Sequence, residues 1–329
     1  MSTIFTRQEG PPTPPQEGKV QTVQVHALQA GHLTLPERFF VNPADETARR
    51  TVPSLAFLIQ HHDPETGHTS RILLDLGIRR SVSRYPEPIQ NHIATRQPLT
   101  TDPDVTKSLA AGGLTPEDID YVIYSHVHWD HVGEPRDFEK STFVVGNGAL
   151  ELLSGSSASL RGSHSFFESD LLPEARTIEL RNPYETDSPS SSQDLAKMTT
   201  GPNFHQSWRP QGHLPRVLDI FNDGSVLIVD APGHLPGHIN ILAKTGPVSS
   251  VYLAGDACHD RRIMRKEREI GEWSDAEGHI CCIHGDKKVA EQTIEHIRQL
   301  EKQGVEVIFA HDVEWEENPQ NAGRFFGSK

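Results

Sequence analysis

The sequence predicts an α/β fold in which two mixed sheets pack face to face and helices cover their outer faces. Strand-like segments dominate the first part of the chain, and strands followed by helices occur in both halves. A group of histidines also follows one strand directly, which is where α/β proteins commonly place their chemistry. Periodicity alone does not distinguish this αββα sandwich from a doubly wound sheet.

The early segments carry signals for individual strands and helices. Residues 20–28 alternate between apolar and polar, residues 54–59 are an apolar run, and residues 71–76 form a run closed by Gly77. A capping side chain before a proline predicts helix starts at Asp102-Pro103 and at Thr115-Pro116. Residues 121–125 then predict a strand that ends where the histidines begin.

The later segments repeat this order. We expect a strand at 142–145, the start of a helix at 148–153 and further strands at 239–243 and 251–254. Asn222-Asp223-Gly224 is typical of a tight hairpin turn between strands at 217–221 and 226–229. Residues 287–302 carry a helical apolar stripe, and residues 305–310 predict a final buried strand.

The 329 residues fit one domain, which we expect to span residues 19–329. The first 18 residues contain two Pro-Pro pairs with Gly and Gln, a composition typical of a disordered leader. They lack the pattern of a secretory signal, and no apolar run approaches the roughly 18 residues that span a bilayer. We therefore expect a cytoplasmic protein without a membrane segment.

Residues 154–214 are rich in Ser, Pro, Gly and Asn, and we predict that they form an insertion near the active site. Aromatic residues in this segment, such as Phe167 and Trp208, could close over a substrate. A surface excursion that does not contact the site is the alternative.

The formal net charge is -14, from 31 Lys and Arg against 45 Asp and Glu. Affinity for nucleic acid comes mainly from Lys and Arg that displace counterions, so this charge argues against a nucleic-acid partner. We expect a small-molecule substrate. The sequence makes no prediction about the oligomeric state.

Four potential metal ligands lie within six residues, at His126, His128, Asp130 and His131. Neutral imidazole nitrogens and carboxylate oxygens suit zinc and similar divalent ions. Adjacent ligands that face different directions can serve two ions, so the motif favours two metal sites. A histidine-rich turn held only by hydrogen bonds is the alternative.

The order of the motifs resembles that of the metallo-β-lactamase superfamily, whose His-x-His-x-Asp-His motif also follows a strand. Residues 230–238 resemble the Pro-Gly-His-x-x-Gly-His segment of the family, and residues 253–256 resemble its strand-end aspartate segment. Residues 309–312 match the last ligand histidine. The resemblance covers residues from about 20 to 315 except for 154–214, and it implies the αββα fold.

The resemblance also implies the ligands of two metal ions. His126, His128 and His234 would hold one ion, and Asp130, His131 and His311 would hold the other, with Asp256 and a hydroxide shared between them. Asp75 would support the ligands from behind, and His238 would pack behind His234. We expect two divalent ions, zinc by default, with manganese, iron or cobalt as alternatives.

Within the superfamily the sequence is most similar to the N-acyl homoserine lactonase-like branch. This likeness implies a dinuclear metal-dependent hydrolase that opens a lactone by attack of the bridging hydroxide. Asp130 or His259 would handle the proton of the leaving group. His259 stands where the lactonases tend to carry a tyrosine, and a histidine could protonate the leaving amine of a lactam, so a small cyclic amide is an alternative substrate.

Other members of the superfamily leave further alternatives. A thioesterase is a second hydrolytic possibility, and a mononuclear iron dioxygenase that acts on persulfides shares the fold and the motif. Phe39, Phe40 and Trp208 are candidates for the walls of the substrate pocket, because small-molecule pockets combine apolar walls with few polar groups.

Overall fold

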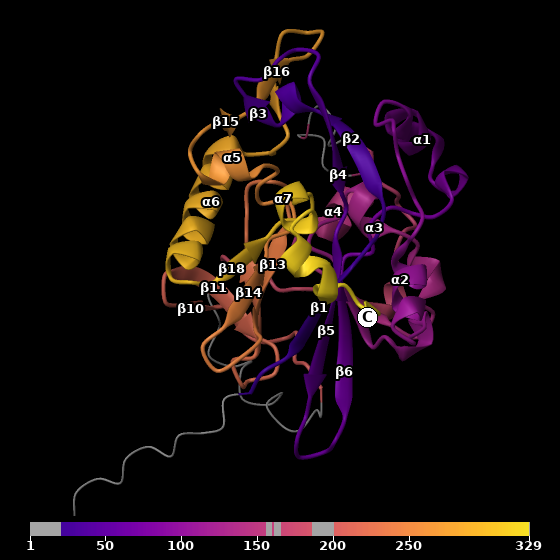
Figure 1. Ribbon diagram of the computed structural model, residues 1–329, viewed down its shortest axis with the longest axis vertical. Helices are drawn as coiled ribbons and strands as arrows, with labels where there is room; N and C mark the ends of the chain where they lie inside the picture. Colours follow the sequence, from indigo (N-terminus) through magenta and orange to yellow (C-terminus); the bar gives the residue numbers. More distant parts are fainter. Residues whose placement is uncertain (1–20, 156–159, 161–165, 186–200, 329) are drawn as a thin grey trace, which may run out of the picture.

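The computed structural model describes residues 21–155, 160, 166–185 and 201–328. The predicted leader, residues 1–18, lies outside these residues. Two six-stranded sheets face each other (Figure 1). In spatial order the first contains β1 (Gln24–Leu28), β5 (Ala56–His62), β6 (Thr69–Leu74), β7 (Tyr121–Ile123), β8 (Thr142–Val145) and β9 (Thr177–Glu179).

The second sheet is built from the second half of the chain. In spatial order it contains β10 (Arg209–Gln211), β11 (Leu214–Asp219), β12 (Val226–Asp230), β13 (Ile239–Lys244), β14 (Ser250–Leu253) and β18 (Glu306–Ile308). Both sheets are mixed, because β6 to β9 run parallel in the first sheet and β14 pairs parallel with β18 in the second. The hairpin predicted at Asn222-Asp223-Gly224 is confirmed, since β11 and β12 pair antiparallel on either side of it.

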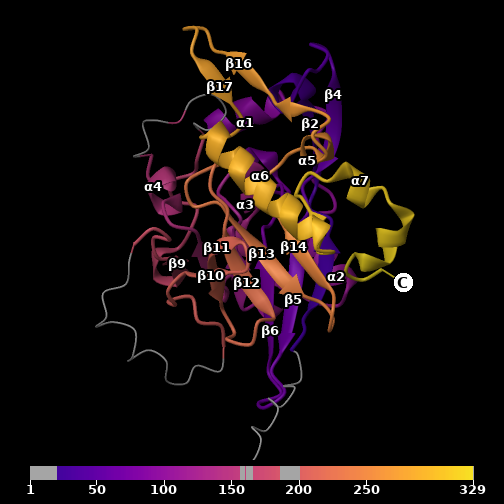
Figure 2. The same ribbon diagram turned by 90° about the vertical axis from the view of Figure 1, so that its left-hand side faces the viewer.

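Apolar side chains from the inner faces of the two sheets form the central core. Phe57 and Ile59 of β5 belong to the same buried cluster as Ile228 of β12 and Ile241 of β13. A second cluster lies between the first sheet and α2 (Val105–Ala111) and α4 (Ala149–Leu153). A third lies between the second sheet and α6 (Lys287–Lys302), which crosses that sheet in Figure 2. The αββα sandwich is therefore confirmed.

Helix α6 shows how the local sequence sets an element. The side chain of Asp286 accepts a hydrogen bond from the backbone N–H of Val289 and so caps the first turn. Ala290, Ile294 and Ile297 are buried against the second sheet, as the apolar stripe predicts. The helix has the predicted bounds.

Two predicted helix starts differ from the structure. Helix α2 begins at Val105 because Asp104, not Asp102, accepts a hydrogen bond from the N–H of Lys107. The Thr115-Pro116 signal produces only a single 3-10 turn (Pro116–Asp118), although the predicted capping is present. The turn does not continue into a helix, because Ile119 directly after it is already extended.

The segment predicted to be an insertion contributes an edge strand to each sheet. β9 pairs with β8, and β10 pairs with β11, so residues 177–179 and 209–211 belong to the sandwich itself. Each strand has only three residues, which is too short for an alternating pattern to stand out. Only the remainder of 154–214 is a candidate for an insertion.

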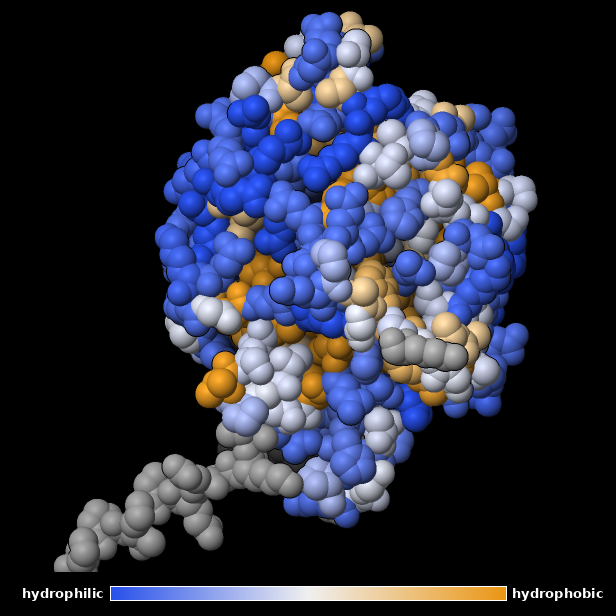
Figure 3. Space-filling model, viewed as in Figure 1, coloured by the Kyte–Doolittle hydropathy of each residue, from blue (hydrophilic) through white to orange (hydrophobic). Residues whose placement is uncertain are grey.

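Several short elements complete the described part of the chain. They are β2 (His32–Pro36), β3 (Val41–Asn42), β4 (Arg49–Pro53), α1 (Glu87–Ala94), α3 (Trp129–Val132), α5 (Arg261–Met264), β15 (Glu269–Ile270), β16 (Glu272–Ser274), β17 (Ile280–Cys282), α7 (Val313–Glu316), and 3-10 turns at 37–39, 82–84, 135–137, 174–176 and 319–324. Hydrophilic residues cover most of the face seen in Figure 3. Within the ranges that the structure describes, no helix combines the length and the apolar character needed to cross a membrane.

Candidate metal centre

The seven predicted ligands lie beyond the ends of four strands, and the structure brings them together. The motif 126–131 follows β7, His234 follows β12, Asp256 follows β14 and His311 follows β18. Backbone hydrogen bonds join these loops: Ile239 N–H donates to the Ser125 carbonyl across the two sheets, and Ala310 N–H donates to the Gly255 carbonyl within the second sheet. All seven side chains are buried.

One group of candidate ligands converges around His128. Its Nδ1 lies 2.9 Å from Nε2 of His126 and 3.1 Å from Nε2 of His234. Oδ2 of Asp256 lies 3.7 Å from Nε2 of His126 and 3.6 Å from Nε2 of His234. One ligand atom from each of the four residues lies within 4.8 Å of the others, which is close enough for all four to hold one ion.

A second group lies on the other side of Asp256. Its other oxygen, Oδ1, lies 3.3 Å from Nε2 of His131 and 3.4 Å from Nε2 of His311. Oδ2 of Asp130 lies 3.5 Å from the same His311 nitrogen. Asp256 therefore has one carboxylate oxygen towards each group.

Contacts behind the ligands fix the orientation of the rings. Nδ1 of His131 donates to Oδ2 of Asp75 at 2.9 Å, and Nδ1 of His311 donates to the carbonyl of Pro53 at 2.7 Å. The Ser125 hydroxyl donates to Asp75 and lies 3.1 Å from Nδ1 of His126. With Nδ1 engaged in this way, Nε2 of each ring faces the centre as an acceptor. Asp75 thus supports the site as the sequence suggests.

The chemistry of the donor set fits divalent cations. Nε2 of His131 and Oδ1 of Asp256 are buried, lie 3.3 Å apart and have no hydrogen-bond partner among the described residues. Two such acceptors repel each other unless a proton or a cation lies between them. In the protein without metal, a proton lies between these two atoms. The Asp256 and Asp75 carboxylates outweigh the effect of burial and raise the pKa of His131 well above its usual value.

The histidines of the first group are set up differently. Burial, followed by the charge of neighbouring histidines, lowers the pKa of His126 and of His234 well below the usual value. These rings therefore stay neutral near pH 7, and a neutral imidazole is the form that binds a metal ion.

His238 holds the backbone of Asp256 in place. Its Nδ1 donates to the carbonyl of Ala231 at 3.0 Å, and its Nε2 accepts the N–H of Asp256 at 3.1 Å. Burial lowers the pKa of His238 to about 4, so the ring stays neutral. Gly255 makes this approach possible, because a Cβ there would lie 2.8 Å from Cβ of Ser125. His238 packs behind the site as expected.

Apolar and polar side chains line a cavity at the candidate ligands. Leu33, Leu35, Phe40 and Ile283 provide apolar walls, and His92 and Arg96 provide polar ones. The free space is about 30 Å³, which is room for little more than water. Phe40 is a wall residue as predicted, with its ring 5.1 Å from that of His259. The prediction for Phe39 is wrong, because its ring packs on Trp273 instead.

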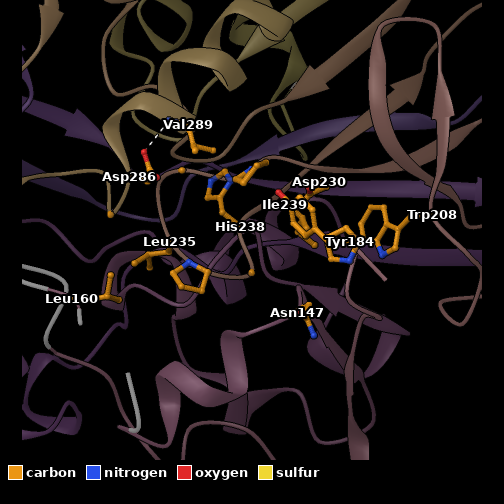
Figure 4. Close-up of a pocket in the computed structure, with 16 residues that line it drawn as sticks. Asn147, Leu160, Tyr184, Trp208, Asp230, Leu235, His238, Ile239, Asp286 and Val289 are labelled. Carbon is orange, nitrogen blue, oxygen red and sulfur yellow. Dashed lines mark hydrogen bonds between the residues drawn. The ribbon is translucent and has the colours of Figure 1, made fainter. Parts of the chain in front are cut away.

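A larger cavity of about 440 Å³ lies behind the loop that carries His234. Figure 4 shows Trp208 beside Tyr184 on its wall, with His238 further along. The Trp208 indole donates to the carbonyl of Arg181, which keeps the ring away from the candidate ligands. The prediction that Trp208 lines the metal-site cavity is therefore wrong, whereas Phe167 of the same segment stacks 6.0 Å from His128.

His259 lies at the candidate site, with its Nε2 3.1 Å from Oδ2 of Asp256. Sequence reasoning missed its neighbour His284, whose buried ring lies 5.3 Å from that of His259 and 5.2 Å from that of His234. His284 follows β17 without a ligand-like spacing. Only the tertiary fold reveals its place.

His92 makes the stability of the protein depend on pH. Burial, with a smaller contribution from Arg96, lowers the pKa of His92 to about 4. An unfolded histidine titrates near 6.5, so the unfolded chain binds more protons below that pH and stability falls as the pH drops from 7 towards 4. Between pH 7 and pH 5 the free energy of unfolding should fall by about 1 kcal/mol less in His92→Leu than in the parent protein, a figure that allows for the partial exposure of His92. Urea unfolding at both pH values measures this, with exposed His68→Leu as control. Equal losses in His92→Leu and the parent would contradict it.

The αββα sandwich places a cluster of histidines and aspartates at its strand ends, and this cluster defines a candidate metal centre. The chain belongs to the metallo-β-lactamase superfamily, because the model of that family matches residues 49–303. The sequence prediction of the family is thereby confirmed.

Similar proteins carry several names. Cytochrome P450 monooxygenase mpaDE of Penicillium brevicompactum is 27% identical over 316 residues, which cover 88% of this chain but 33% of that protein. The chain thus spans about a third of the length of this relative. Gamma-lactamase FDB1 of Fusarium pseudograminearum is 26% identical over 211 residues, covering 63% of this chain and 45% of that protein.

A solved structure shares the fold. It is an N-acyl homoserine lactone hydrolase with its product, N-hexanoyl-L-homoserine, bound at the catalytic metal centre. It is 20% identical, with a TM-score of 0.59, and the match covers 90% of this chain and 96% of the other.

Proposed function

We propose that this protein is a dinuclear metal-dependent hydrolase that opens a lactone. The observation that carries this proposal is the position of Asp256, which has one oxygen towards each of two ligand groups. His126, His128 and His234 would hold one ion, Asp130, His131 and His311 the other, and Asp256 would bridge them. Nitrogen and oxygen donors of this kind favour zinc.

The two cations, when bound, would activate water for attack on an acyl carbon and stabilise the charge that develops on its oxygen. The residues of the chain have separate tasks. Asp75 and the Pro53 carbonyl orient His131 and His311. Asp130 lies on the cavity wall, where its carboxylate could accept a proton from the attacking water. Leu33, Leu35 and Phe40 would keep bulk water away from the reacting group.

His259 is our candidate for the acid that protonates the leaving group. It lines the cavity, its Nε2 is held by Asp256, and its buried Nδ1 has no hydrogen-bond partner among the described residues. We expect His259→Ala to lower kcat by about 100-fold while metal content stays unchanged, because proton transfer typically contributes that much or more. Steady-state kinetics with metal analysis measure this, and His205→Ala at an exposed position is the control. Loss of metal in His259→Ala would assign His259 to metal binding instead.

A lactam is the second candidate substrate. The gamma-lactamase relative favours it, and so does His259, since a leaving amine needs a proton more than a leaving alkoxide does. Comparing the hydrolysis of a lactone with that of a lactam of the same ring size distinguishes the two substrate classes, because the surroundings of the carbonyl group are otherwise the same. A higher kcat/KM on the lactam would favour the amide.

Metal analysis followed by a substrate panel tests the proposal. About two zinc ions per chain and turnover of lactones, lost in His128→Ala, would support it. Turnover of thioesters alone would point to a thioesterase. One iron per chain with oxygen uptake on a persulfide would overturn the proposal in favour of a dioxygenase.

A further inference from the structure

Arg96 stands out among the residues that line the metal-site cavity. It follows α1, and it is the only arginine or lysine among the described lining residues. The backbone there is well held, because the Arg96 N–H donates to Ile93 and its carbonyl accepts from the N–H of Thr34. The guanidinium is therefore presented to the cavity from a fixed point on the chain.

The guanidinium of Arg96 has no carboxylate partner within 4.0 Å in the described parts of the chain. Its one side-chain hydrogen bond runs from Nη1 to the hydroxyl of Thr95, at 2.7 Å. By contrast, the buried Arg79 is paired with Glu168 and the half-buried Arg261 with Asp312. Four of the five guanidinium donors of Arg96 thus remain for another acceptor.

Arg96 is half-buried, and partial burial of an unpaired cation has a cost that a ligand could offset. Burial lowers the pKa of Arg96, and Asp130 acts in the opposite direction, but an arginine remains charged at neutral pH. Asp130 lies on the same cavity wall and belongs to the candidate metal ligands, so it is not available to neutralise Arg96. A charge held in this way is stabilised when an anionic group binds beside it.

The charge of the loaded site points in the same direction. On the proposed function, two divalent cations would bring four positive charges, whereas Asp130 and Asp256 carry two negative charges. Arg96 adds another positive charge. Such a site attracts anions. The planar fork of an arginine matches a carboxylate with two parallel hydrogen bonds.

We propose that Arg96 is an anion-binding subsite and that the substrate is a cyclic ester or amide that carries a carboxylate away from the scissile bond. This proposal rests on the proposed function for the reaction, but the recognition of the acid belongs to Arg96. Arg96 is a specificity residue, because it contacts the substrate at a point where no bond changes. His92, which stays neutral, lies beside it in the cavity wall.

A matched substrate pair tests this subsite. The substrates are a five-membered lactone with a carboxylate side chain and its methyl ester, which have the same ring. We expect the parent protein to prefer the acid and Arg96→Gln to raise KM for the acid by about 10- to 100-fold, the range of charge-assisted hydrogen bonds, with little change for the ester. Arg96→Lys should retain part of the preference, and exposed Arg268→Gln should retain all of it.

Binding provides a readout that does not depend on turnover. Calorimetric titration of the metal-loaded protein with the ring-opened diacid and its monomethyl ester should give a tighter Kd for the diacid in the parent protein only. Equal effects of Arg96→Gln on acid and ester would overturn the proposal and leave Arg96 as a residue that positions Asp130. If no lactone or lactam is hydrolysed, the proposed function fails, and the two Kd values still decide whether Arg96 binds an acid.

Discussion

Asp256→Asn is expected to lower kcat/KM for the lactone by about 1000-fold and to reduce the bound metal from two ions towards one. Loss of a group that only supports a ligand costs about 10- to 100-fold, and loss of one group that stabilises the transition state costs up to about 1000-fold. Asp256 would serve both ions, so the larger figure applies. Its two oxygens face different ligand groups, and an amide offers only one oxygen to them.

The substitution should leave the fold intact. Asparagine has the shape of aspartate, and the backbone N–H that donates to His238 is unchanged. In the protein without metal, the substitution removes the Asp256 charge that helps to keep His131 protonated, so the metal-free variant should be less stable than the metal-free parent.

Metal analysis, kinetics and thermal unfolding of the same samples check these expectations. Asp223→Asn is the matched control, because Asp223 lies in the hairpin turn between β11 and β12 and pairs with His61, and neither residue is a candidate ligand. Two ions per chain with near-parent activity in Asp256→Asn would show that Asp256 does not bridge the metals.

The sequence predicts the parts of the site that depend on short-range order. His126 to His131 are neighbours in the chain, so their grouping is visible without any knowledge of the fold. Asp256 and His311 are single residues, and only their positions after predicted strands point to a common edge. Helix α6 was also predictable from local sequence, because the 3.6-residue period of its apolar residues repeats several times over 16 residues.

The cavity walls could not be predicted in the same way. Arg96 and Asp130 are 34 residues apart, and no periodic signal relates α1 to the motif loop. His284 likewise reaches the site only through the packing of the β16–β17 hairpin. Trp208 looked like a substrate-facing aromatic, but the neighbouring strand β10 directs it to a different cavity. Such placements depend on tertiary contacts rather than on local sequence.

Arg79→Met is expected to lower the free energy of unfolding by about 3 kcal/mol, at the lower end of the range for breaking a buried ion pair. Arg79 is one of the largest fully buried side chains. Its Nη2 donates to Glu168 at 2.9 Å, and its Nε donates to the carbonyl of Gly133 at 2.9 Å. Methionine fills much of the same volume but leaves the buried carboxylate without this partner.

Two features determine the size of this effect. Arg136 still donates to Glu168 in the variant, so the charge is only partly uncompensated and the loss stays near the lower limit. Gly133 ends the short helix α3 that carries Asp130 and His131. The freed Gly133 carbonyl should therefore loosen this helix and weaken metal binding together with stability.

Urea unfolding of Arg79→Met, with Arg80→Met as control, separates the buried pair from a general effect of removing charge. Arg80 pairs with Asp104 and Asp137 but is far more exposed, and surface pairs contribute at most about 1 kcal/mol. Adding Glu168→Gln to Arg79→Met should recover part of the loss, because the uncompensated charge is then removed. If Arg79→Met and Arg80→Met lower the free energy of unfolding equally, the buried ion pair of Arg79 does not contribute more stability than a surface pair, and the prediction is contradicted.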